Sequence, residues 1–458
     1  MIKLRKHGQV QPGFKWGPFT ARIPFIHLRL SLSDLLQGFA VSGATGLALV
    51  PYFTMLLGLS FEEAVVMALI HSTLIAFSWM LFGDPYAPGW LTPAIPFVVA
   101  FITAPAYLGD HVAQFQAMTA LSLNFAMILI VLGLTGWGAK LIQSVPNVLK
   151  GGIILGAAIA AFLRVTKDGD AANVFQSAPI AGTLGVVVCL LAAFSKPLQH
   201  IAQRNKLIAT ILSLGLLPGF IIAGTVGYFT TELEFNIRWE ILDIAGATAG
   251  LWAKASPFAI GWPPLEVFIS SFPLALITYI LFFGDVVTGN EMIHQAQEER
   301  KDEKLDVNTS RAHLATGIRN IMMGISAPFF STQGALWTGI QVVLLKRWTQ
   351  AKETNHSLFD SIGSFYILGL PILFILLPLV TLLEPLLPVA LAVTLILTAF
   401  ACATLALSLV TDATERGAMV ITAMAFSLFE PWAGLLIGLF TIAALCGPSV
   451  FLPKRGHH

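Results

Sequence analysis

One polar stretch in the second half of the chain carries residue types that could bind a small solute. Residues 327–338 read Ala-Pro-Phe-Phe-Ser-Thr-Gln-Gly-Ala-Leu-Trp-Thr and interrupt an otherwise apolar region. The polar and small residues that are candidates for substrate contact are Ser331, Thr332, Gln333, Gly334 and Ala335. A short apolar helix is expected to follow, and a helix N-terminus attracts carboxylates, oxyanions and ring carbonyls. The same residue types also serve as structural helix caps, which is the alternative.

The first half contains a matching stretch. Residues 84–96 read Asp-Pro-Tyr-Ala-Pro-Gly-Trp-Leu-Thr-Pro-Ala-Ile-Pro, with Thr92 as the polar candidate before another short apolar helix. Irregular backbone is tolerated at membrane depth only where it is buried in protein or lines a water-filled cavity. Two matching breaks in membrane helices therefore indicate one binding site. Aromatic residues in both stretches would either stack on a planar ligand or serve for packing alone. They are Tyr86, Trp90, Phe329 and Phe330.

A few ionisable residues lie inside apolar segments, where charge is costly and usually functional. Asp285 is the acid nearest the proposed site, and Thr288 follows within one helical turn. Asp285 is a candidate substrate contact, and with Thr288 it is a candidate for coupling to Na+ or H+. The alternative is a span that ends earlier and leaves Asp285 in the cytosol. His71 is expected to pack as a neutral ring, and Arg319 to cap or cross-link helices, with anion binding as its alternative role.

The composition places these stretches in a polytopic membrane protein. Of the 458 residues, 56% are hydrophobic and only 11% are charged, with a mean hydropathy of +0.79. A water-soluble domain of ordinary composition is thereby excluded, and the lipid bilayer is the expected surrounding. The net charge of +1 gives no indication of nucleic-acid binding. The three cysteines show no metal-ligand spacing, so neither a metal nor another cofactor is expected beyond a coupling ion.

Apolar runs of roughly 17 to 25 residues, with two short broken ones allowed, predict an all-α fold of about fourteen spans. The predicted segments are a cytoplasmic N-terminal segment (1–32), seven spans (33–228), an outer loop with a short interfacial helix (229–264), seven further spans (265–450) and a cytoplasmic tail (451–458). The charged stretch 294–311 is interpreted as a solvated cytoplasmic link. Small residues at four-residue spacing predict close helix packing. They are Gly152, Gly156 and Ala160, and Gly434 and Gly438.

An odd number of spans per half inverts the second half relative to the first, and the basic residues support this arrangement. With the N-terminus in the cytoplasm, 21 of the 26 Lys and Arg residues fall in inner segments, 4 fall in outer segments and one, Arg319, lies inside a span. This asymmetry predicts a multi-pass protein of the cytoplasmic (inner) membrane.

Several stretches resemble the nucleobase–ascorbate permeases and, more distantly, the SulP anion transporters that share their fold. Residues 43–51, Gly-Ala-Thr-Gly-Leu-Ala-Leu-Val-Pro, are similar to the Gly-Ala-Thr then Val-Pro pattern of the permeases' first helix. Residues 145–152 are similar to the proline- and glycine-containing start of their fifth span. Residues 273–290 followed by 311–338 resemble their eighth to tenth spans in order and approximate spacing.

The resemblance implies two inverted seven-span repeats, a division into core and gate domains, and a homodimer. Spans 3 and 10 would begin as short strands, meet at mid-membrane and continue as half-helices. The chain departs from the permeases in span 8, where Leu281 stands in place of the glutamate that holds the base. In span 10 only Gln333 keeps the family's residue type. Because this acceptor for ring N–H groups is missing, an anion is ranked slightly above a nucleobase as the expected substrate.

These features favour a secondary active transporter that moves a small polar or anionic solute by alternating access. The solute is expected to be held between Thr92 and residues 331–335. The alternatives left open are a proton symporter of uracil- or xanthine-type nucleobases, an anion channel and a membrane-embedded enzyme. No ring of like charges or repeated filter sequence favours a channel, and no catalytic motif favours an enzyme. Because an ATP-binding loop is absent, energy is expected from an ion gradient or from substrate exchange.

Overall fold

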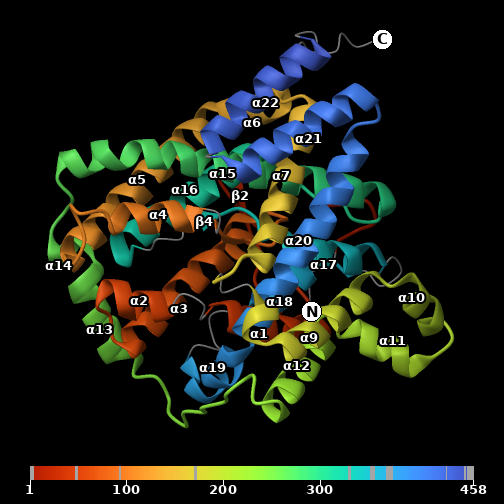
Figure 1. Ribbon diagram of the computed structural model, residues 1–458, viewed down its shortest axis with the longest axis horizontal. Coiled ribbons are helices and arrows are strands. Elements are labelled where there is room, and N and C mark those ends of the chain that lie inside the picture. Colours follow the sequence, from red (N-terminus) through yellow and green to blue (C-terminus); the bar gives the residue numbers. More distant parts are fainter. Residues whose placement is uncertain are drawn as a thin grey trace.

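The computed structural model describes residues 5–46, 50–91, 94–169, 173–328, 332–350, 356–367, 375–429, 431–447 and 450 (Figure 1). Most of these residues are helical. In chain order, the helices are α1 (Leu32–Gly46), α2 (Val50–Leu57), α3 (Phe61–Phe77), the π-helix η1 (Ser78–Phe82), α4 (Ile95–Ile102), α5 (His111–Thr135), α6 (Trp137–Ser144), α7 (Asn147–Thr166), α8 (Val174–Ser177), α9 (Pro179–Phe194), α10 (Lys196–Ala202), α11 (Lys206–Ser213), α12 (Leu217–Phe229), α13 (Ile244–Ala255), α14 (Pro257–Ile260), α15 (Leu265–Glu299), α16 (Thr309–Ser326), α17 (Thr338–Gln350), α18 (Leu358–Ile367), α19 (Leu377–Leu383), the 3-10 helix η5 (Glu384–Leu386), α20 (Leu387–Leu409), α21 (Ala413–Leu428) and α22 (Pro431–Cys446). The strands are β1 (Phe14–Trp16), β2 (Phe19–Ala21), β3 (Gly89–Trp90) and β4 (Gln333–Gly334).

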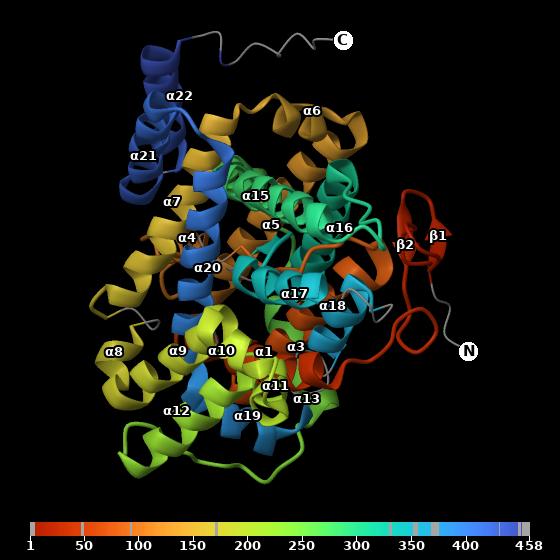
Figure 2. The same cartoon turned by 90° about the vertical axis from the view of Figure 1, so that its right-hand side faces the viewer.

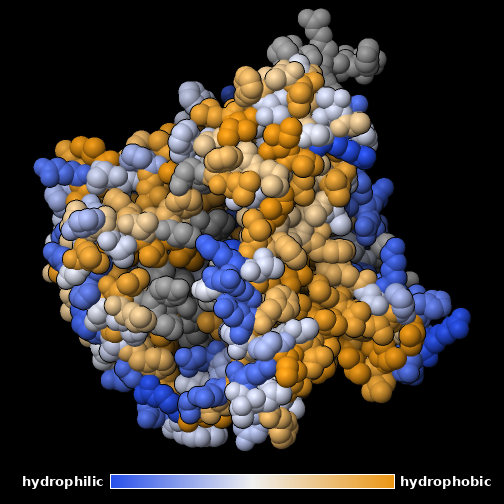
Figure 3. Space-filling model, in the orientation of Figure 1, coloured by the Kyte–Doolittle hydropathy of each residue, from blue (hydrophilic) through white to orange (hydrophobic). Residues whose placement is uncertain are grey.

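The helices confirm a multi-pass membrane protein. Among the described residues, five helical segments are long and apolar enough to cross a membrane, and two bent helix pairs raise the number to seven if each is one span. Broad apolar areas cover the face drawn in Figure 3. Exposed apolar side chains include Phe400 and Leu407 of α20 and Phe440 of α22, as expected of helices in contact with lipid. The count of about fourteen spans stays a prediction.

Helix packing falls into two groups. In the first, α5 lies against α15 and α16, and α1 lies against α18. In the second, α7 lies against α20 and α21, and α9 lies against α12 (Figure 2). The groups meet where α1 and α17 contact α20 and where α15 contacts α7.

Small residues allow the closest contacts of the second group, as predicted. A Cβ atom added at Gly152 of α7 would lie 2.5 Å from Thr422 Cγ2, and one added at Gly438 of α22 would lie 2.6 Å from the same atom. Thr422 of α21 is fully buried between them. Alanine at either position would therefore force the helices apart.

The charged stretch between the halves is solvated only in part. Helix α15 continues to Glu299. In the segment that follows it, the charged side chains of Lys301, Lys304 and Asp306 are exposed, as predicted. Arg300, however, is 1% exposed and Glu303 is fully buried. Composition alone could not show that partners for these two charges come from residues 5–11 and 348–360.

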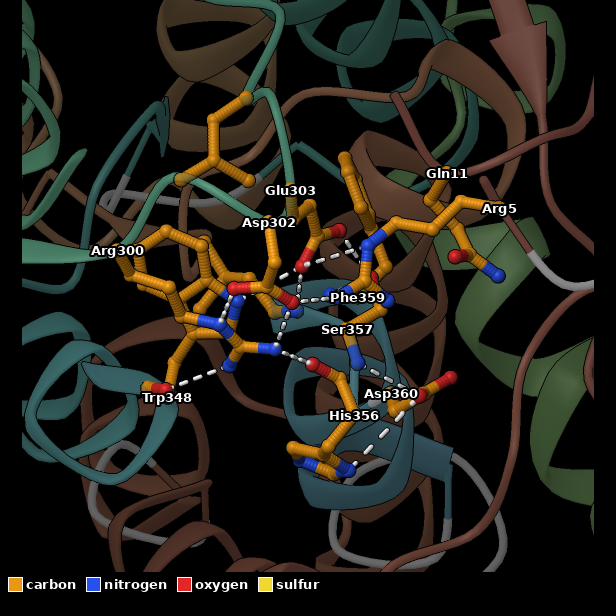
Figure 4. A network of polar contacts seen from close by, with 12 residues as sticks. Arg5, Gln11, Arg300, Asp302, Glu303, Trp348, His356, Ser357, Phe359 and Asp360 are labelled. Carbon is orange, nitrogen blue, oxygen red and sulfur yellow. Dashed lines mark hydrogen bonds and ion pairs between the residues drawn. The ribbon is translucent and has the colours of Figure 1, made fainter. Parts of the chain in front are cut away.

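Glu303 is the centre of that network (Figure 4). Its carboxylate accepts hydrogen bonds from Trp348 Nε1 (2.7 Å), Ser357 Oγ (2.5 Å) and the Leu358 amide (3.1 Å), and Arg5 Nε lies 4.0 Å away. Every neighbour here donates, so an ionised carboxylate fits the site and an apolar side chain does not.

The N-terminal segment closes this network from the other side. Gly8 N–H donates to the Asp302 carbonyl (2.8 Å), and Lys304 N–H donates to the Gln9 carbonyl (3.2 Å). Arg5 and Arg300 both pair with the Asp302 carboxylate, and the Arg300 hydrogen bond and these charges lower the pKa of Asp302 below its ordinary value. Residues 5–9 are thus held to the connection between the two halves.

The β1–β2 hairpin attaches the next residues of the N-terminal segment to the helices. Phe14 to Trp16 pair antiparallel with Phe19 to Ala21, and Gly17 has a φ of +55° at the turn. Phe19 packs with Phe82 of η1 and Ala315 of α16. Figure 2 shows the hairpin beside α16, at the edge of the molecule. The sequence predicted only a cytoplasmic segment here.

Candidate functional site

The two interrupted stretches meet as a pair of short strands. Gly89 of β3 lies opposite Gly334 of β4, and Trp90 lies opposite Gln333, in an antiparallel pair. The Leu91 amide extends this pairing by donating to the Thr332 carbonyl at 2.9 Å. Helices α4 and α17 follow the strands, so the predicted arrangement of a strand before each half-helix is confirmed.

Side chains from α17 and α18 hold the first stretch in place. Gln341 accepts a hydrogen bond from the Ala87 amide at Oε1 (2.5 Å) and donates to the Pro85 carbonyl from Nε2 (3.3 Å). Tyr366 donates its hydroxyl to the Pro88 carbonyl (2.5 Å). These contacts satisfy backbone groups that the irregular chain leaves unpaired, which is the condition for such backbone at membrane depth.

Arg319 of α16 points its guanidinium into the strand crossing and is fully buried. Nη1 donates to Gln333 Oε1 (3.2 Å), and Nη2 donates to Thr316 Oγ1 (3.0 Å) and to the Gly334 carbonyl (2.8 Å). Among the described residues, no carboxylate pairs with Arg319, and its Nε has no hydrogen-bond partner. The crossing therefore contains a buried positive charge whose partners there are all neutral oxygens.

Gln333 connects Arg319 to a second ionisable side chain. Its Nε2 donates to His71 Nδ1 at 3.3 Å, and His71 Nε2 in turn donates to the Ala327 carbonyl at 2.8 Å. Asn320 fixes the backbone of Gln333, because its side chain accepts from the Gln333 amide and donates to the Gln333 carbonyl, both at 3.1 Å. The carboxamide of Gln333 is thus oriented by both of its neighbours.

The carboxylate that lies within electrostatic range of Arg319 is already paired elsewhere. Asp84 follows η1 and accepts from Arg311 Nε at 3.0 Å. Arg22, another buried arginine, donates to the carbonyls of Gln11 and Gly83 instead of a carboxylate. Asp84 is therefore committed to Arg311 and gives Arg319 no direct ion pair among the described residues.

Four of the predicted contact residues lie together at the crossing, all buried: Thr332, Gln333, Gly334 and Ala335. Thr332 Oγ1 is a further buried atom without a hydrogen-bond partner among the described residues. Gln333 lies in β4, five residues before α17, and does not cap that helix. The predicted contacts Thr92 and Ser331, and the aromatic candidates Phe329 and Phe330, lie outside the described residues.

Asp285 lies apart from these residues, on α15. No contact joins it to Gln333 within the described chain, and it lies within electrostatic range of Cys402 of α20. The part of the chain that is described gives the Asp285 carboxylate no hydrogen bond or ion pair. The Thr288 hydroxyl donates to the Gly284 carbonyl of its own helix (2.8 Å). Asp285 of the predicted coupling pair therefore lies near α20, where the two helix groups meet, and the described hydrogen bond of Thr288 stays within α15.

The two residues that sequence reasoning undervalued are Arg319 and His71. Their expected roles were cross-linking and neutral packing, yet both contact Gln333 at the crossing. The available signal was the cost of an ionisable residue in the middle of an apolar span. Nothing in the sequence, however, places either residue next to β4.

Comparison with known proteins gives partial likenesses only. No family model matches the chain, and no curated protein matches it. Among solved structures, the chain is similar to the transmembrane domain of a cyanobacterial bicarbonate transporter, BicA, at 14% identity and a TM-score of 0.45, covering 89% of this chain and 97% of that one. It is also similar to SLC26A9 (12% identity, TM-score 0.48, 91% and 65% covered) and to murine Slc26a9, an anion transporter in the inward-facing state (13%, 0.47, 91% and 68%). These superpositions are too weak to assign a family.

Proposed function

We propose that this chain is a secondary active transporter that binds a small anion at the β3–β4 crossing and moves it across the cytoplasmic membrane by alternating access. The observation that carries the proposal is Arg319, fully buried beside β4 and paired there with neutral oxygens alone. A charge in such a place costs several kcal/mol unless an opposite charge compensates it. An anionic substrate supplies that charge.

The remaining donors favour an anion over a nucleobase. Arg319 Nε and Thr332 Oγ1 are buried without described partners, whereas both ends of the Gln333 carboxamide are engaged by Arg319 and His71. A nucleobase needs a free acceptor for its ring N–H groups as well as donors. Of the two unpaired groups, Arg319 Nε can only donate, whereas the Thr332 hydroxyl can donate or accept. A charged donor beside a hydroxyl suits a carboxylate or an inorganic oxyanion better than a neutral ring.

The strand crossing also supports alternating access. Two half-helices that start from a shared central site allow one helix group to move against the other around a bound solute. The groups defined by α5, α15 and α16 and by α7, α20 and α21 are the elements that would move. Transport driven by an ion gradient distinguishes this proposal from an anion channel.

Uptake into proteoliposomes tests the proposal. The purified chain is reconstituted and supplied with radiolabelled sulfate, bicarbonate, a short dicarboxylate, uracil or xanthine, with and without an imposed proton or sodium gradient. Gradient-driven accumulation of one of the anions is expected. Uptake of uracil or xanthine alone would contradict the anion proposal and favour the nucleobase symporter, and downhill anion flux with no response to either gradient would favour a channel.

Asp285 is expected to affect coupling more than binding, because it lies on α15 within electrostatic range of Cys402 of α20 and makes no described hydrogen bond to Gln333. Asp285→Asn should abolish uphill accumulation while preserving anion binding and exchange across the membrane. The measurement is accumulation against a gradient compared with counterflow in the same vesicles. Glu291→Gln is the control, because Glu291 lies six residues further along α15 and pairs with Lys150 at 2.7 Å. A mutant at Asp285 that concentrates the anion as well as the parent would place coupling elsewhere.

A further inference from the structure

A chain of hydrogen bonds runs from Arg319 through Gln333 to His71, and its direction is fixed at both ends. Arg319 only donates, so the Gln333 atom 3.2 Å from Nη1 must be the amide oxygen. The Ala327 carbonyl only accepts, so His71 Nε2, 2.8 Å from it, must carry the ring proton. Nδ1 of the neutral ring is then an acceptor, which matches the Gln333 NH₂ group at 3.3 Å. Both ends require the same orientation of the carboxamide.

We propose that anion binding at Arg319 is accompanied by uptake of one proton at His71, and that reversal of the Gln333 carboxamide connects the two events. This inference rests on the proposed anion site. A proton added to Nδ1 turns an acceptor into a donor, which Gln333 can meet only by turning its oxygen toward His71. Its NH₂ group then faces Arg319, whose Nη1 loses its acceptor and becomes available to the anion. The proton comes from a hydronium ion of the solvent: one O–H bond of that ion breaks, the Nδ1–H bond forms, and a water molecule is released.

Electrostatics link the two events in the same direction. In the empty site, a second positive charge one side chain away from Arg319 is unfavourable, and His71 stays neutral. A bound anion attracts both charges, so each ligand strengthens the binding of the other by the same factor. The anion is therefore carried together with a proton, and its affinity rises as the pH falls.

Among the described residues, the other charged groups near α3 have partners of their own. Those on elements packed against α3 are Lys254 of α13 with Glu63 of α3 (2.7 Å), Arg311 of α16 with Asp84 (3.0 Å), and His313 of α16 with the Thr309 carbonyl (2.8 Å). Glu63 lies two turns before His71, and α2 and η1 contain no charged residue. Arg319, reached through Gln333, is the charge to which His71 is connected by hydrogen bonds.

Calorimetry on the purified full-length protein tests the link. Nitrate and sulfate are suitable probes, since neither titrates between about pH 5.5 and 8.5, the range in which histidine changes charge. Titrations in buffers of different ionisation enthalpy count the protons taken up per anion. The unmodified protein is expected to take up close to one proton per anion at the acidic end of this range, where the anion-bound protein is protonated and the empty site is still neutral, with affinity rising by up to about tenfold for each unit of pH decrease.

His71→Gln should remove both the proton uptake and the pH dependence, because its amide can bond to Ala327 but cannot take up a proton. Gln333→Leu should bind with a shallower pH dependence than the parent, because Arg319 Nη1 no longer has an acceptor to lose and only the direct electrostatic attraction remains. His313→Gln, a matched change at another buried histidine, should behave as the parent. Undiminished proton uptake in His71→Gln, or a pH dependence in Gln333→Leu as steep as in the parent, would overturn the link. If the parent binds neither probe nor any anion of the uptake panel, the anion site itself is wrong.

Discussion

Arg319→Met is expected to abolish anion binding while the chain remains folded. One charge-assisted hydrogen bond contributes about 1.5 to 3 kcal/mol, which corresponds to about 10- to 150-fold in affinity. Loss of the positive charge in a buried site lowers the affinity for the anion further. The fold should tolerate the change, because methionine removes an uncompensated charge and leaves only neutral oxygens of Gln333, Thr316 and Gly334 with fewer donors.

Thermal unfolding with and without anion measures both effects. An anion at about 100 times its dissociation constant stabilises a folded protein by about 2.7 kcal/mol, and this stabilisation should disappear in Arg319→Met. Arg22→Met is the matched control, since Arg22 is also buried but donates to the Gln11 and Gly83 carbonyls away from β4. An anion-dependent shift in Arg319→Met as large as in the parent would remove Arg319 from the site. A variant that fails to fold would instead assign Arg319 the structural role.

Glu303→Ala is expected to produce the largest loss of stability outside the crossing. The substitution removes a carboxylate that lies beside Arg5. It also leaves the buried N–H groups of Trp348 and Leu358 without their hydrogen-bond acceptor. Removing one partner of a buried charged network costs about 3 to 5 kcal/mol. The free energy of unfolding in detergent, measured by denaturant titration, should fall by that amount.

The control for Glu303 is Glu298→Ala. Glu298 lies five residues earlier, its side chain is 73% exposed, and its one ion pair is with His294 at 3.8 Å. Surface changes of this kind alter stability by no more than about 0.5 kcal/mol. If the two variants lose equal stability, the N-terminal segment does not hold the connection between the halves as the contacts in Figure 4 indicate.

The strand crossing could be predicted from the sequence because its signals are local. A proline-aromatic pair followed by small and polar residues and a short apolar run occurs in both 84–96 and 327–338. Such a pattern restricts the backbone conformation without any tertiary contact, since proline and small residues interrupt helices. Gln333 and Gly334 accordingly lie in β4 and pair with β3 as expected.

The identity of the charged groups at the site could not be predicted in the same way. Arg319 precedes Gln333 by 14 positions and His71 precedes it by 262, and neither position has a local signature. Side-chain contacts across such separations depend on how α3 and α16 pack. The same reason explains Glu303, whose burial depends on Trp348 and Ser357.

The position of a bound anion tests the central claim most directly. Crystals are grown with the heavy-atom counterpart of the transported anion, selenate for sulfate or bromide for chloride, and anomalous diffraction locates it. The account predicts a peak within hydrogen-bond distance of Arg319 Nε, beside Thr332 and β4. A peak elsewhere in the membrane region of a transport-competent protein, with no density next to Arg319, would contradict it.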